Sequence, residues 1–213
     1  MLEIDQLVRQ ITIYALPLLF AITLHEAAHA YAARRFGDST AYMLGRMTLN
    51  PLKHIDPIGT VLLPLLLLMT GGFIFGWAKP VPVNFSALRK PRQHGRWVAA
   101  AGPLANFAMV ILWASLQKLA SVGVGEFSEP LWLMGRAGVA INISLMLLNL
   151  LPILPLDGGR IVESLLPPRW AWRFAQTERY GMWLVLILLA TGGLGLILQP
   201  FYRLMYDLIR LFF

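Results

Sequence analysis

Residues 11–33 read ITIYALPLLFAITLHEAAHAYAA, and this stretch decides both the fold and the chemistry of the chain. At about 1.5 Å per residue, a helix of this length crosses a bilayer hydrocarbon core about 30 Å thick. His25 and His29 lie four residues apart, so a helix places both imidazoles on one face, where they can bind a single metal ion. Polar residues at membrane depth are costly and normally serve a function, which favours a metal site over a chance match.

Glu26 follows the first histidine and would lie beside a metal ion bound there. Zinc lowers the pKa of a bound water from about 15.7 to roughly 7, and a nearby carboxylate can take the proton as that water attacks a carbonyl. The pattern therefore indicates peptide hydrolysis, with Glu26 as the candidate general base. The alternative is that the two histidines bond to neighbouring helices and hold no metal.

Composition restricts the class of protein. Of the 213 residues 57% are hydrophobic and only 14% charged, which predicts an all-α integral membrane protein. Apolar runs fill most of the length, so we expect a single membrane-embedded domain over residues 1–213. The chain has no cysteine, so zinc would need His and carboxylate ligands. The net charge of +7 is distributed as expected for lipid headgroups, and no nucleic-acid partner is predicted.

Four to five transmembrane helices are expected. The clear spans lie near residues 11–33, 97–119, 131–151 and 180–198. A further stretch, 58–84, is interrupted by Gly71-Gly72 and ends in an extended run whose two prolines restrict it to the edge of a sheet. The C-terminal residues 201–213 are patterned as an amphipathic helix lying in the membrane interface.

The distribution of charge predicts the topology of a multi-pass protein in the cell membrane. Segments 34–57, 77–96 and 157–179 are basic and the 121–130 loop is acidic, so the three basic segments should be cytoplasmic. The first two can share a side only if 58–84 enters the membrane and returns, and about twelve helical residues before Gly71 rise only about 18 Å. We therefore predict a re-entrant helix/β-strand element; the alternative is a fifth ordinary span.

The same topology places the metal site inside the bilayer, toward the cytoplasmic side. Nine residues separate His25 from Arg34, which is about 13–14 Å of helix. A catalytic zinc site usually has three protein ligands and one open position, so a third ligand is required. The best candidate is Asp157 in the run NLLPILPLDGGR at 149–160, where two prolines break the helix. By itself, an aspartate before a short helix is more often a cap.

Three motifs carry a family resemblance. HEAAH in the first span, AAAGPLANF at 99–107 and NLLPILPLDGGR at 149–160 resemble the site-two protease family of intramembrane zinc metalloproteases, in the family's order. The resemblance implies one zinc ion per chain, and it implies an extended edge strand over 76–84 that pairs with an unwound substrate. The site residues it implies are the zinc ligands His25, His29 and Asp157, the general base Glu26, and Asn149 as a polar group near the scissile carbonyl or its oxyanion.

The chain resembles the compact members of that family, because it has no room for a PDZ-like peptide-binding domain or a CBS nucleotide-sensing pair. The expected partners are a single-span membrane protein as substrate and the lipid bilayer, while a gating partner and the oligomeric state stay open. Asn106 and Asn142 could contact substrate or bond to neighbouring helices, and the second role is the commoner one in membranes. The alternative function is zinc binding or zinc transport without hydrolysis.

Overall fold

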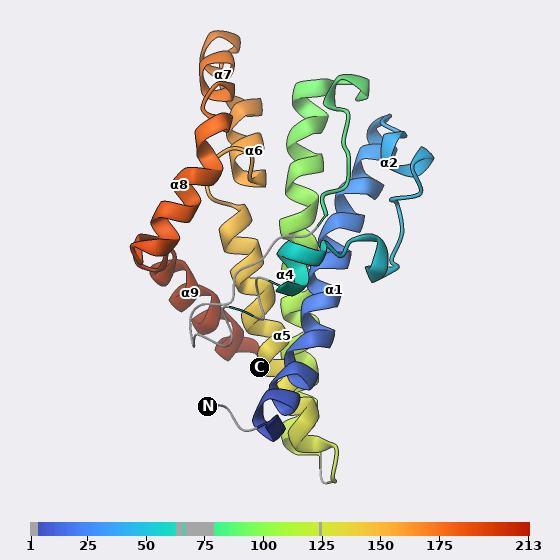
Figure 1. Cartoon of the computed structure of the whole chain (residues 1–213), viewed down its shortest axis with the longest axis vertical. Coiled ribbons are helices and arrows are strands. Elements are labelled where there is room, and N and C mark those ends of the chain that lie inside the picture. The colour runs from blue at the N-terminus through green and yellow to red at the C-terminus, as the bar shows by residue number, and fades with distance from the viewer. Residues whose placement is uncertain (1–3, 63–65, 67–78, 124) are drawn as a thin grey trace.

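The computed structural model describes residues 4–62, 66, 79–123 and 125–213 of the chain, and these form helices joined by turns and irregular segments, with no strand among them (Figure 1). The predicted all-α class is therefore confirmed. The elements are α1 (Ile4–Phe36), α2 (Thr40–Met43), η1 (Pro51–Lys53), η2 (Pro57–Leu62), η3 (Phe85–Ala87), α4 (Pro91–Val122), α5 (Ser128–Asn149), α6 (Asp157–Leu165), α7 (Pro168–Ala175), α8 (Glu178–Ala190) and α9 (Gly193–Phe212).

Three of the described helices are long and apolar enough to cross a membrane. They cover Val8–Phe36, Pro91–Val122 and Ser128–Asn149, which correspond to the first three predicted spans. A fourth span is present if α8 and α9, which are bent by 82° at their junction, count as one. The chain is therefore a multi-pass membrane protein by the length and composition of its helices.

Helix α4 is the centre of the bundle, since it packs against α1, α5 and α6. Its contact with α5 is close because glycines face it: a Cβ on Gly135 would lie 2.8 Å from the Gln117 Cβ, and one on Gly138 would overlap the Trp113 ring. Small residues at such contacts are the usual way for membrane helices to approach each other. Val110 and Ile143 are almost completely buried in the resulting core.

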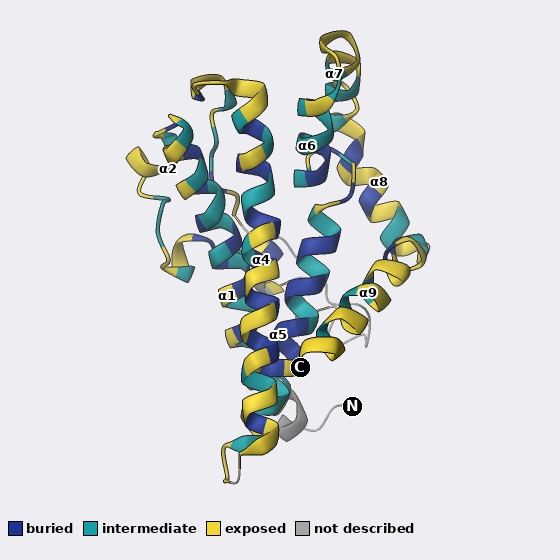
Figure 2. Ribbon diagram, turned by 180° about the vertical axis from the view of Figure 1, so that it is seen from behind, coloured by how far each residue is buried: buried dark blue, intermediate teal, exposed yellow. Residues whose placement is uncertain are grey.

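The outer faces of the helices carry large apolar side chains. Figure 2 shows buried residues along the inner faces of the long helices and exposed residues along their outer faces and over α8 and α9. A soluble protein rarely exposes this much contiguous apolar surface, whereas a surface that faces lipid requires it. Exposed residues of this kind include Leu16, Phe20, Leu104, Phe107, Ile111, Leu112, Trp183 and Ile187.

Helix α1 ends and α4 begins at the same end of the bundle (Figure 1). The amide of Arg89, just before α4, donates a 3.0 Å hydrogen bond to the carbonyl of Phe36, the last residue of α1. The chain between these helices therefore makes no net crossing of the bundle. The predicted re-entrant turn falls largely on residues 63–65 and 67–78, which lie outside the described residues.

The predicted edge strand is wrong for its described part, residues 79–84. Pro80 and Pro82 have no amide hydrogen, and the flanking backbone groups bond to irregular segments instead of a neighbouring strand. The Lys79 amide donates to the His54 carbonyl at 3.0 Å, and the Asn84 amide donates to the buried carboxylate of Asp38 at 2.7 Å. These hydrogen bonds therefore hold the segment in place without pairing it to another strand. Residues 76–78 of the predicted strand lie outside the described part.

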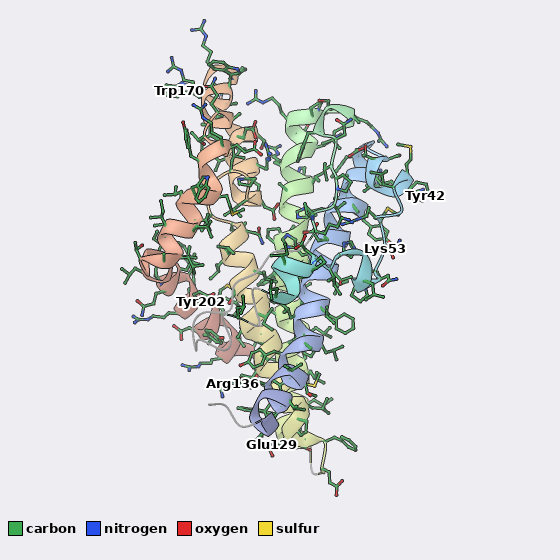
Figure 3. All side chains as sticks on the ribbon, viewed as in Figure 1. Tyr42, Lys53, Glu129, Arg136, Trp170 and Tyr202 are labelled. Carbon is green, nitrogen blue, oxygen red and sulfur yellow. The ribbon has the colours of Figure 1, made fainter. Side chains whose placement is uncertain are left out.

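The stretch predicted to span at 180–198 is not one continuous helix. Helix α8 ends at Ala190, and Gly192 takes a left-handed conformation with φ of 74° before α9 begins. Glycine adopts this conformation without steric cost and commonly ends helices in this way. The C-terminal helix therefore starts before residue 201, and it returns to α5, where the Tyr202 hydroxyl donates to Ser144 Oγ at 2.7 Å (Figure 3).

Gly181 allows α8 to pack directly on the turn between α5 and α6. A Cβ at this position would overlap the backbone carbonyl oxygen of Leu154, which a rotamer change cannot relieve. We expect Gly181→Ala to lower the free energy of unfolding by at least the roughly 1–3 kcal/mol typical of overpacking. The measurement is thermal unfolding of the detergent-solubilised protein.

The matched control is Gly195→Ala in α9, where an added Cβ meets nothing within 4 Å. Alanine should be neutral or slightly stabilising there, because glycine is the poorer helix former. Equal melting temperatures for the two variants would contradict the close contact at Gly181.

Candidate metal centre

Three side chains from distant parts of the sequence converge between α1 and α6. His25 Nε2 and His29 Nε2 lie 3.0 Å apart, and Asp157 Oδ2 lies 3.2 Å from the first and 3.4 Å from the second. They are the group of potential metal ligands found among the described residues. The structure therefore brings together the two histidines and the aspartate that the sequence predicts as ligands.

The turn after α5 presents Asp157 to α1. Pro152 and Pro155 cannot continue the helix of α5, and α6 starts immediately after the turn. Two buried glycines then allow α6 to lie against the turn: a Cβ on Gly158 would lie 2.5 Å from the Leu151 carbonyl oxygen, and Gly159 is equally crowded. The run LPLDGG thus fixes the position of the carboxylate through backbone contact.

The cap interpretation of Asp157 is wrong. Leu156 is the N-cap residue of α6, and no side-chain cap bond is made. Asp157 is the first helical residue, and its Oδ2 atom is buried without a hydrogen-bond partner among the described residues. A buried carboxylate oxygen without a partner is unfavourable unless a cation or donor completes it.

The three donors fit zinc. Zinc binds imidazole nitrogen and carboxylate oxygen at about 2.0–2.2 Å in tetrahedral geometry, which separates neighbouring donor atoms by about 3.3 Å. The observed separations of 3.0, 3.2 and 3.4 Å match that spacing. Three protein ligands leave one tetrahedral position for water or substrate, which is typical of a catalytic site and not of a structural one.

Helix α4 contacts the far nitrogen of each histidine. His25 Nδ1 lies 2.6 Å from Asn106 Oδ1, and His29 Nδ1 lies 2.8 Å from the Val98 carbonyl oxygen. Both partners are acceptors, so each imidazole donates from Nδ1 and keeps the Nε2 lone pair for a metal ion. One helix therefore orients both imidazoles.

The Glu26 carboxylate is held beside the histidines by the segment at 79–84. Its Oε2 atom accepts a 2.7 Å hydrogen bond from the Val81 amide. Because Pro80 and Pro82 flank Val81, its amide is the one backbone donor among residues 80–82. The bond fixes the position of the carboxylate, which α1 carries next to His25 in the sequence.

The structure does not join Asn149 to this group. Its Nδ2 donates to the Leu145 carbonyl one turn earlier in α5, at 3.0 Å. The interhelical bonding favoured for Asn106 is confirmed, since its side chain donates to Ala21 on α1 and to Asn142 on α5. The sequence analysis did not predict its contact with His25. The available signal was its spacing: Asn106 stands four residues after Gly102, so both lie on the face of α4 that meets α1.

Gly102 provides the space that the imidazoles occupy. A Cβ there would lie 2.5 Å from His25 Cε1 and 2.6 Å from His25 Nε2. Gly102→Ala should displace the rings and weaken zinc binding by at least the about 10- to 100-fold that follows loss of a ligand's support. Zinc content of the purified protein is the measurement. Gly195→Ala is the control, and a Gly102→Ala protein with full zinc content would contradict the packing described here.

Comparison with known proteins agrees with this geometry. Residues 120–191 match the profile of peptidase family M50, a region that contains Asp157. The chain is 42% identical over 194 residues to YwhC of Bacillus subtilis, provisionally named a zinc metalloprotease, covering 86% of this chain and 82% of that protein. No solved structure matches the chain.

A second relative, Rip2 of Mycolicibacterium smegmatis, carries the same provisional name. It is 32% identical over 193 residues, which cover 88% of this chain and 69% of the relative. Both alignments extend well beyond the region matched by the family profile. The chain therefore belongs to peptidase family M50, the site-two protease family of zinc metalloproteases.

Proposed function

We propose that this protein is an intramembrane zinc endopeptidase that cuts single-span membrane proteins in or near their transmembrane segment, close to the cytoplasmic face. The observation that carries the proposal is the convergence of His25, His29 and Asp157 at spacings of 3.0–3.4 Å within a bundle of apolar helices. Glu26 follows His25 on the same helix. Family membership supports the metalloprotease chemistry. The membrane location of the cut is inferred from the helices that carry the site.

Each residue has a definite role in the proposed reaction. His25, His29 and Asp157 would hold one zinc ion per chain, and when bound this ion would polarise the scissile carbonyl and acidify the attacking water. Glu26 takes the proton from that water and later delivers it to the leaving amine. The Val81 amide holds the Glu26 carboxylate in place for both transfers.

Asn149 is proposed as a polar group for the scissile carbonyl or its oxyanion. It ends α5, at the entrance to the turn that presents Asp157. In this role its side-chain amide leaves the Leu145 carbonyl that it now contacts and turns toward the substrate. A neutral amide donor suits this task because it stabilises developing negative charge without a proton transfer.

The substrate must be extended at the cut, because a peptide bond within a helix is shielded by its neighbours. Residues 79–84 form neither helix nor strand, and their Val81 amide contacts Glu26, so we propose that this segment lies beside the unwound substrate backbone. Pro80 and Pro82 lack amide hydrogens and the Val81 amide is engaged by Glu26, so the central part of this segment offers carbonyl acceptors to the substrate.

The proposed orientation in the cell membrane follows from charge. The basic segments around α2, the start of α4 and α7 lie at one end of the bundle (Figure 1), and Glu129 lies at the opposite end (Figure 3). The positive-inside rule then assigns the first end to the cytoplasm. Because His25 lies nine residues before Arg34, we propose that the site lies inside the bilayer on the cytoplasmic side. The proposed protein is a single domain over 1–213.

The ligand assignment is tested by zinc analysis of the purified protein with His25, His29 or Asp157 changed to Ala, one at a time. Each variant should lose zinc, because two ligands bind far more weakly than three. Asp207→Ala, on the exposed side of α9, is the control and should retain it. Retention of zinc by Asp157→Ala would remove the aspartate from the ligand set.

Glu26→Gln tests the general base. The amide keeps the size of the side chain but cannot take a proton, so cleavage of a co-expressed single-span membrane protein should fall by about 10²- to 10⁴-fold while zinc stays bound. The control is Glu129→Gln, which breaks only the exposed pair with Arg9 at the far end of the bundle. Cleavage at the wild-type rate by Glu26→Gln would exclude the proposed mechanism.

A further inference from the structure

A chain of buried amide groups connects three helices behind the metal ligands. Asn106 on α4 accepts from His25 on α1 at 2.6 Å, donates to the Ala21 carbonyl of α1 at 3.2 Å, and donates to Asn142 Oδ1 on α5 at 2.9 Å. Asn142 donates in turn to the Gly138 carbonyl at 2.8 Å. Both asparagine side chains are completely buried, so water does not compete for these bonds.

The bonds leave one possible orientation for each amide. Asn142 must direct its NH₂ group toward the Gly138 carbonyl, which leaves its oxygen facing Asn106. Asn106 therefore directs its own NH₂ group at two acceptors, and its oxygen necessarily faces His25. Since that oxygen can only accept, His25 must carry its proton on Nδ1. The Nε2 lone pair is then directed at His29 and Asp157.

We propose that Asn106 is a positioning residue that sets the ring orientation and tautomer of His25 for metal binding, with Asn142 holding Asn106 in place. This inference rests on the proposed metal site. His29 obtains the equivalent support from the Val98 carbonyl, a backbone group that substitution does not remove. Among the described residues, Asn106 is therefore the side chain whose replacement removes the hydrogen-bond support of a histidine ligand.

A purely structural role makes a different prediction. Buried asparagines often bond membrane helices to each other, and such a bond contributes to stability alone. Loss of it would lower the melting temperature without changing the affinity of the remaining protein for zinc. A positioning role instead predicts weaker zinc binding, typically by about 10- to 100-fold when the partner of a metal-bound histidine is removed.

The experiment measures the zinc dissociation constant of the full-length protein in detergent, by competition with a chromogenic chelator. Asn106→Leu removes the acceptor at similar volume and should weaken zinc binding by about 10- to 100-fold. Asn106→Asp keeps an oxygen facing His25 but loses the NH₂ group that donates to Ala21 and Asn142, so it should recover only part of the affinity. Asn142→Leu leaves Asn106 without its partner on α5 and should give a smaller loss.

The matched control is Ser144→Ala, which removes the bond between α5 and α9 formed with Tyr202. It should lower stability without changing zinc affinity. Wild-type zinc affinity in Asn106→Leu, or an equal loss in Ser144→Ala, would overturn the inference. If Asn106→Leu does not fold, unchanged affinity in Asn142→Leu overturns it in the same way. A wild-type protein that binds no zinc would instead refute the proposed function.

Discussion

The contact between α1 and α4 is the constraint on which the rest of the structure depends. Gly102 leaves room for the His25 and His29 rings, and the same face of α4 supplies the Val98 carbonyl and the Asn106 amide that orient them. A side chain at Gly102 would separate the helices. It would remove the room for the rings and both hydrogen bonds that orient them. Gly102 therefore provides the space for the two imidazoles, and the close approach of the two helices brings the groups that orient them within hydrogen-bonding distance.

Burial makes the hydrogen bonds and the donor atoms of this site energetically important. In an apolar bundle, a polar group without a partner is costly, so polar groups are expected to satisfy one another. Asn106, Asn142 and the Nδ1 atoms of both histidines do so through direct hydrogen bonds. The two Nε2 atoms and Asp157 Oδ2 all present lone pairs to the same point. A divalent cation bound there satisfies all three atoms at once.

Much of the fold follows from local sequence patterns. The first three spans form near their predicted positions, because a long apolar run specifies a helix by its composition alone. The predicted strand failed at 79–84, where proline restricts the backbone but no neighbouring strand is present. The stretch predicted to span at 180–198 is broken into two helices because Gly192, within the apolar run, ends α8.

For the candidate site too, the sequence predicts some features and only the tertiary structure shows the others. The sequence by itself determined the pair His25 and His29 and the neighbouring Glu26, because the helical repeat places residues four apart on one face, and it marked Asp157 by the prolines that break the helix before it. Only the tertiary structure decided that Asp157 reaches the histidines, that Asn106 supports His25 and that Val81 holds Glu26. These contacts join residues at least 55 positions apart, and helix periodicity carries no information about which faces of separate helices will meet.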